Sequence, residues 1–112
     1  MCRIEVLAEG LGFTEGPVLL PDGRLGVVSL SHGCVYLIGD GPMEGIDTGG
    51  GPNGLAVDDD GTLFVAQNGG IWGGAGPVSP GVQVIRDGSV EYLVESMGAP
   101  NDLAFGPDGR LW

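Results

Sequence analysis

Three segments of this chain repeat one pattern. Each begins with a residue that carries a side-chain oxygen, continues through alternating apolar positions, and reaches an Asp-Gly pair; the segments are Glu15–Leu25, Asn53–Leu63 and Asn101–Leu111. The Asp of each pair lies seven positions after the first residue, and successive Asp residues are 38 and 48 positions apart. A period of about 40–50 residues built from short strands is typical of a β-propeller with one blade per repeat. The repeat therefore predicts an all-β fold with Glu15, Asn53 and Asn101 at equivalent places in three successive blades.

Glycine and proline divide the chain into runs that are too short for ordinary helices. The 112 residues include 24 Gly and 8 Pro, and the longest segments free of both have nine residues. An average helix has about 11–12 residues. Apolar runs bounded by turn residues predict strands instead. These runs are Ile4–Ala8, Val18–Leu20, Leu25–Leu30, Cys34–Ile38, Leu55–Val57, Leu63–Ala66, Val82–Ile85, Val90–Val94 and Leu103–Phe105.

We interpret residues 1–112 as the N-terminal part of one propeller domain. Blade one covers about residues 15–51, blade two about 52–99, and blade three begins at 100. A closed propeller has about four to eight blades, so we expect these residues to be a fragment of a longer protein.

A glycine-rich insertion, Gln67–Gly81, interrupts blade two and contains Trp72. Alternating strand directions place this loop at the same end of the blades as Glu15, Asn53 and Asn101. An aromatic side chain on such a rim loop can close over a ligand. A surface loop without a contact role is the alternative.

The charge balance excludes several classes of partner. The chain has 4 basic and 15 acidic residues and a formal net charge of −11. Nucleic acids and anionic membrane surfaces are bound by basic surfaces, which four cations cannot form, whereas a divalent cation would be attracted. No apolar run reaches the ~18–20 residues of a membrane span, and Glu5 and Glu9 interrupt any signal-peptide core. With only two cysteines, a cytoplasmic location is the default expectation.

The repeated strand starts offer ligands for a hard cation. Glu15 supplies a carboxylate, and Asn53 and Asn101 supply amide carbonyls. Ca²⁺ takes 6–8 oxygen ligands from such groups and from water. The alternative is that these side chains only satisfy backbone groups where strands begin. His32 is the only histidine, so a zinc triad or a Ser-His-Asp set cannot form within the chain.

Several motifs resemble the senescence-marker-protein/gluconolactonase (regucalcin-like) family. They are Glu15-Gly16-Pro17, Pro52-Asn53-Gly54-Leu55, and Pro100-Asn101-Asp102-Leu103 followed by Pro107–Trp112. The resemblance implies a six-bladed propeller that hydrolyses lactones of sugar acids or other lactones around one divalent metal, for which we expect Ca²⁺, with Zn²⁺, Mg²⁺ or Mn²⁺ as alternatives.

The resemblance also implies roles for particular residues. Glu15 and Asn101 match metal ligands, and Asp102 matches the acid beside them, in contact with substrate or with the ligands. Asn53 matches the repeat and is a weaker candidate for the same surroundings. The remaining ligands, an Asn and an Asp, belong to later blades, and the Asp is the expected general base.

The implied function is metal-dependent lactone hydrolysis by the full-length protein, with this chain carrying part of the site and being inactive alone. The metal would polarise the lactone carbonyl and stabilise the oxyanion. A non-catalytic propeller that binds a partner through its rim loops is the alternative, because fold alone does not give function. A third possibility is another chemistry on the same fold, as in the strictosidine-synthase-like branch.

Overall fold

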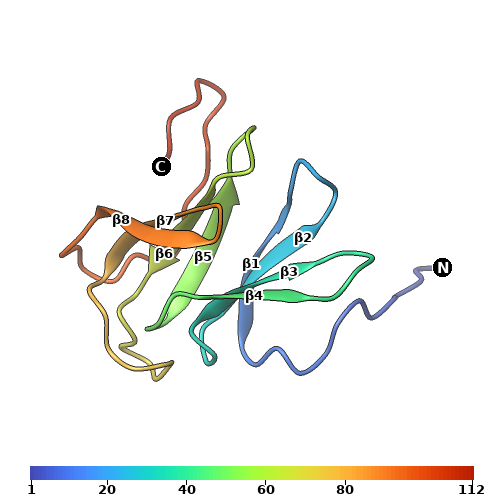
Figure 1. The fold of residues 1–112 in the computed structure, drawn as a ribbon, viewed down its shortest axis with the longest axis horizontal. Helices are drawn as coiled ribbons and strands as arrows, with labels where there is room; N and C mark the ends of the chain where they lie inside the picture. The colour runs from blue at the N-terminus through green and yellow to red at the C-terminus, as the bar shows by residue number, and fades with distance from the viewer.

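The computed structural model describes all 112 residues. Eight strands form two antiparallel sheets, which lie side by side (Figure 1). The first sheet, in spatial order, consists of β1 (Thr14–Leu19), β2 (Leu25–Ser29), β3 (Cys34–Ile38) and β4 (Glu44–Asp47). The second consists of β5 (Pro52–Val57), β6 (Leu63–Gln67), β7 (Gly81–Arg86) and β8 (Ser89–Val94). Each sheet is a four-stranded meander, so the predicted all-β fold is confirmed, and the sheets are two blades of a partial β-propeller. The chain forms no helix with the length and apolarity needed to cross a lipid bilayer.

The Asp-Gly pairs form the turns that the sequence predicts. Gly23, Gly61 and Gly109 have φ values of 90°, 88° and 80°, which glycine adopts without steric cost. In the first turn Asp22 Oδ1 accepts a hydrogen bond of 3.0 Å from the backbone N–H of Arg24. The third turn repeats this contact two residues after its own Asp, at 3.1 Å. An Asp that bonds the backbone two residues later stabilises a turn without help from the rest of the fold.

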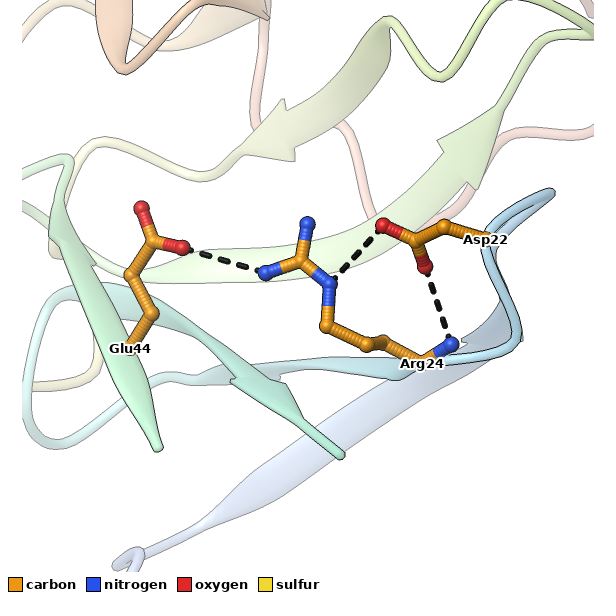
Figure 2. A network of polar contacts seen from close by, with 3 residues as sticks. All are labelled: Asp22, Arg24 and Glu44. Atoms are coloured by element: carbon orange, nitrogen blue, oxygen red, sulfur yellow. Dashed lines mark hydrogen bonds and ion pairs between the residues drawn. The ribbon is translucent and has the colours of Figure 1, made fainter. Parts of the chain in front are cut away.

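An ion-pair network ties the first turn to the outer strand of its blade (Figure 2). Arg24 Nε lies 2.9 Å from Asp22 Oδ2, and Arg24 Nη1 lies 3.1 Å from Glu44 Oε2. All three side chains are more than one third exposed, so water screens the attraction. The network lies at the Asp-Gly end of the blade, away from the starts of β1 and β5. Arg24 therefore takes no part in a site at the starts of those strands.

The core lies between the two sheets. Nine buried apolar side chains form one cluster: Leu20, Val28, Val35, Leu37, Ile46, Leu55, Leu63, Val65 and Ile85. The innermost strand of the second sheet, β5, packs against β1 and β2. Gly16 makes this approach possible, because a Cβ there would lie 2.7 Å from the backbone nitrogen of Leu55. The first strands of successive blades are therefore held close together.

The third repeat packs on the outer side of β5 and β6. Phe105 meets Phe64 edge to face, with ring centroids 5.3 Å apart and an interplanar angle of 82°. Leu103 and Leu111 pack on the same small cluster of buried residues. The predicted strand at Leu103–Phe105 is reduced to one bridge, between Phe105 and Leu111.

The predicted strand at Ile4–Ala8 is wrong. Residues 4–8 have no strand partner, and Ile4, Val6 and Leu7 are 90%, 68% and 64% exposed. Alternating apolar residues favour a strand only where a neighbouring strand supplies backbone hydrogen bonds. Within this chain β4 and β8 are the outer strands of the sheets, and residues 4–8 pair with neither.

Candidate metal and substrate site

Strand register brings two loops and two strand starts to one end of the blades. Thr14 of β1 pairs with Ser29 at the end of β2, and Pro52 of β5 pairs with Gln67 at the end of β6. The loops after β2 and β6 therefore lie beside the starts of β1 and β5, at the lower end of Figure 1. The Asp-Gly turns lie at the opposite end. The insertion after β6 thus occupies the end of the blades where Glu15 and Asn53 lie.

Glu15 is an exposed carboxylate at an irregular point of β1. It pairs with Val28, and the register shifts between Glu15 and Val18, where Gly16 and Pro17 lie. Such irregularities turn a side chain out of the regular alternation. One carboxylate oxygen, Oε2, lies 3.4 Å from the Gly16 nitrogen, and none of the three ion pairs in the chain includes Glu15. The carboxylate is therefore open to an external cation.

The candidate residues of the second and third repeats are joined directly. Asn53 Nδ2 donates a hydrogen bond of 2.5 Å to Asn101 Oδ1. Asn53 is only 6% exposed, whereas Asn101 is exposed. Reversing both amides would exchange donor and acceptor but keep the bond, so in either arrangement the pair retains one free carbonyl oxygen and one free NH₂ group. The pair can therefore offer an oxygen to a cation and a donor to a substrate at the same time.

Glycine at position 54 allows the third repeat to approach this closely. A Cβ on Gly54 would lie 2.9 Å from the carbonyl oxygen of Asn101, from Asp102 Cα and from Asp102 Oδ1. Asp102 is exposed, and its Oδ1 accepts a hydrogen bond of 2.8 Å from the backbone N–H of Leu103. The fold thus brings Asn53, Asn101 and Asp102 together.

Glu15 joins this row from the neighbouring strand, because its neighbour Gly16 packs against the backbone of β5. The chain contains no group of three or more His, Cys, Asp or Glu side chains placed to hold a metal ion. A cation at this end would therefore be held by a mixed set of carboxylate and amide oxygens. That set suits a hard cation such as Ca²⁺, which needs 6–8 oxygen ligands, more than these residues supply.

A buried polar network, which the sequence analysis missed, anchors the backbone leading into Asn53. Gln67 is fully buried, and its Oε1 accepts hydrogen bonds from the backbone nitrogens of Gly51 (2.7 Å) and Gly69 (3.0 Å). Its Nε2 donates to the Gly49 carbonyl and to Gln83 Oε1, both at 3.1 Å. The signal was present in the sequence, because Gln67 and Gln83 are the only uncharged polar residues in β6 and β7, whose other residues are apolar apart from Arg86 at the end of β7.

The network also reaches Thr48, the residue that directly follows the outer strand of the first blade. Gln83 Nε2 donates to the Thr48 carbonyl at 3.2 Å, and Thr48 Oγ1 lies 3.1 Å from the carbonyl oxygens of both Gly33 and Gly49, which share its one hydrogen. No buried side-chain polar atom in the chain lacks a partner. A fully satisfied buried network is rigid, so residues 48–51 hold the start of β5 in one position.

The insertion after β6 is tied to this linker and forms one wall of a pocket. Gly70 N–H donates to Asn68 Oδ1 at 2.7 Å, and Ala75 N–H donates to the Gly50 carbonyl at 2.9 Å. Trp72 is 74% exposed and faces a pocket of about 360 Å³, which is also lined by Phe13. The structure thus places Trp72 at the predicted end of the blades. The pocket does not include Glu15, Asn53 or Asn101.

The remaining titratable clusters lie outside this site. Hydrogen bonds from the Thr62 side chain, from Asp58 and from the Thr62 backbone lower the pKa of Asp60 to about 2. Desolvation and the neighbouring Asp60 raise the pKa of Asp58. Both carboxylates belong to the β5–β6 turn at the Asp-Gly end, as the sequence predicts for a hairpin. Burial raises the pKa of the Cys34 thiol, which favours its inert, protonated form.

Comparison with solved structures adds a likeness of fold. The sequence matches no family model and no curated protein. The fold matches the X-ray structure of a protein described as a candidate gluconolactonase, with a TM-score of 0.70 and 21% sequence identity. The match covers 94% of this chain and 56% of that chain, so these residues span little more than half of the solved neighbour. At this identity the likeness establishes the shared fold.

Proposed function

We propose that the protein is a metal-dependent lactone hydrolase and that this chain supplies part of its site. The observation that carries the proposal is the row of oxygen donors in three successive repeats, Glu15 in β1, Asn53 in β5 and Asn101 at the start of the third repeat, with the last two joined by a hydrogen bond. The fold shared with a candidate gluconolactonase supports the same reaction class. The finer assignment, with Ca²⁺ as the metal and a lactone as the substrate, is our proposal.

The residues of this chain have distinct tasks in the proposed site. Glu15 supplies the negative charge that holds the cation. The Asn53–Asn101 pair supplies one carbonyl oxygen to the cation or its waters, and its free NH₂ group orients the substrate. Asp102 lies beside the pair and holds the position of its own backbone through Leu103 N–H. When bound, a divalent cation polarises a lactone carbonyl and stabilises the negative charge that develops on its oxygen.

The charge distribution of the chain agrees with this division of tasks. The four cations are Arg3, Arg24, Arg86 and Arg110, and none lies among the candidate ligands. Arg24 and Arg110 are paired within the Asp-Gly turns. No basic side chain lies among the donors and the net charge is −11, so a bound divalent cation would supply the positive charge that these residues lack for stabilising an oxyanion.

The test is lactone hydrolysis with glucono-1,5-lactone, measured by acid release at constant pH on the full-length gene product and on the 112-residue chain. Chelation should reduce hydrolysis by the full-length product to the spontaneous rate of the lactone in buffer, and added Ca²⁺ should restore the rate above that background. Glu15→Gln removes one charge at constant size and should lower the rate by about 10- to 100-fold or more. Glu44→Gln is the matched control, because Glu44 lies in the ion-pair network at the Asp-Gly end.

Two results would overturn the proposal. One is hydrolysis by the full-length product that survives both chelation and Glu15→Gln. The other is the absence of hydrolysis of both glucono-1,5-lactone and an uncharged alkyl-substituted lactone with any metal, which would favour the alternative of a non-catalytic binding scaffold.

A further inference from the structure

The strongest feature outside the row of oxygen donors is the pocket beneath Trp72. Its volume of about 360 Å³ lies within the range of small-molecule sites, about 300–1,000 Å³. Phe13, Leu30 and Trp72 provide apolar walls, and the lining is completed by glycines of the linker and the insertion and by two polar residues, Ser31 and Asn68. Phe13 and Trp72 are 62% and 74% exposed, an unusual exposure for two aromatic side chains that line one pocket.

Both walls are fixed by hydrogen bonds rather than left mobile. The backbone N–H of Phe13 donates to Ser31 Oγ at 2.9 Å, and its carbonyl accepts from Leu30 N–H at 2.8 Å. The insertion that carries Trp72 is bonded at both ends of its tip, at Gly70 and Ala75. A pocket whose walls are held in place loses little entropy when it binds a ligand.

One buried polar side chain lines the pocket with a free donor. Asn68 is 1% exposed, and its Oδ1 accepts the hydrogen bond from Gly70 N–H. Because that N–H requires an oxygen, the other amide atom is the NH₂ group, and it forms no hydrogen bond within the chain. No fully buried polar atom is unpartnered, so Nδ2 must reach the accessible surface, and Asn68 lines this pocket. The donor is therefore available to an oxygen of a ligand.

The pocket adjoins the proposed metal site. Phe13 lies two residues before Glu15, and Gly51 lies two residues before Asn53, so each wall is at most ~7 Å along the chain from a candidate ligand. One small molecule can therefore reach both places. No cationic side chain lines the pocket, and the chain is strongly acidic, so an anionic group would be repelled.

We propose that this pocket is the subsite for an uncharged, apolar substituent of the substrate, with Asn68 Nδ2 donating to an oxygen of that molecule. The inference rests on the proposed function and narrows it: the preferred substrates are lactones with a hydrophobic side chain rather than the polyhydroxylated lactones of sugar acids. Trp72 and Phe13 cover the apolar substituent. Asn68 selects molecules that place an acceptor oxygen at the inner end of the pocket.

Binding is tested on the metal-free 112-residue chain, so that it does not depend on hydrolysis. The probe is δ-decalactone, an uncharged lactone with a five-carbon side chain, and the signal is the fluorescence of Trp72 in a Trp112→Phe background. We expect δ-decalactone to shift the emission of Trp72 to shorter wavelength, with no response to decanoate or to glucono-1,5-lactone at equal concentration.

Asn68→Asp provides the discriminating variant, because it keeps the acceptor for Gly70 N–H, replaces the free NH₂ donor by a second acceptor oxygen and adds one negative charge. It should weaken binding of δ-decalactone by about tenfold. Ser89→Asp adds the same charge at the exposed β7–β8 turn and should leave binding unchanged. An unchanged emission of Trp72 with δ-decalactone, or equal binding by Asn68→Asp and the parent, would overturn the subsite.

The two proposals fail in different ways. If the full-length protein hydrolyses glucono-1,5-lactone with Ca²⁺ but prefers it to δ-decalactone, the subsite is wrong and the lactonase proposal stands. If Trp72 responds to δ-decalactone but no lactone is hydrolysed, the pocket binds as inferred and the reaction is wrong.

Discussion

Replacing Gln67 by Met should destabilise the protein more than any ordinary surface change, because its amide has several partners in the core. Gln67→Met keeps the length of the side chain and leaves three groups without a partner: the N–H groups of Gly51 and Gly69 and the Oε1 atom of Gln83. The Gly49 carbonyl keeps its hydrogen bond from Thr48 Oγ1. An orphaned buried polar group costs about 1–3 kcal/mol, so the lower end for three groups gives a loss of about 3 kcal/mol.

Gln83→Met is the matched comparison within the same network. It orphans only the Thr48 carbonyl, because Gln67 Nε2 retains the Gly49 carbonyl as its acceptor. The expected loss is about 1 kcal/mol. The double variant no longer contains the unpaired Gln83 oxygen. Its loss of unfolding free energy should therefore stay at about 3 kcal/mol instead of reaching the sum of the two single losses.

Urea unfolding of the parent, the two single variants and the double variant, followed by circular dichroism, measures these losses of unfolding free energy. The comparison requires that the dependence of that free energy on urea concentration is the same for all four proteins. A loss below about 1 kcal/mol for Gln67→Met, or equal losses for the two single variants, would refute the reasoning that the network is fully bonded and buried. A loss of about 3 kcal/mol is a large fraction of the about 5–15 kcal/mol typical of a folded domain. Native-state hydrogen exchange should also become faster at the linker of residues 48–51.

Three further substitutions test separate parts of the structure. Gly54→Ala places a Cβ 2.9 Å from the Asn101 carbonyl, so the side-chain amide signals of Asn101 should shift in NMR spectra, and an unchanged spectrum would contradict the close approach. Leu55→Ala, in the core between the blades, should cost about 2–5 kcal/mol in urea unfolding, and a loss under 1 kcal/mol would place that side chain outside the core. Thr62→Val should raise the pKa of Asp60 from about 2 toward ~3.9 in a carboxyl-carbon NMR titration. In the parent protein, the depressed pKa of Asp60 contributes stability above pH ~4 that is lost as pH falls toward 2. The Thr62→Val variant should lose this pH dependence of stability. A titration midpoint of Asp60 still near 2 in the variant would show that the Thr62 hydroxyl does not cause the low pKa.

The architecture was predictable because its information is local. Each Asp-Gly pair stabilises its own turn, and the spacing of Asp22, Asp60 and Asp108 reports the repeat of the blades. The strand predicted at Ile4–Ala8 failed because a strand also needs a partner, and the pattern of one segment carries no information about its neighbours.

The site was predictable in part. The repeat placed Glu15, Asn53 and Asn101 at one end of the blades, but the bond between Asn53 and Asn101 depends on how closely two blades pack at Gly54. The free donor of Asn68 was not visible in the sequence, because it depends on which atom of its amide the backbone of Gly70 engages. Such features arise from three-dimensional packing, which no sequence period encodes.

The most direct test of the cation site is NMR line broadening of the 112-residue chain by substoichiometric Mn²⁺, a paramagnetic substitute for Ca²⁺. Broadening falls off steeply with distance, so it locates even a weak site that lacks some of its ligands. We predict that the side-chain amide signals of Asn53 and Asn101 broaden first, and that Glu15→Gln reduces this broadening while Glu44→Gln does not. Broadening confined to the acidic turn at Asp58 and Asp60, or equal broadening in the parent and Glu15→Gln, would contradict a cation site at the strand starts.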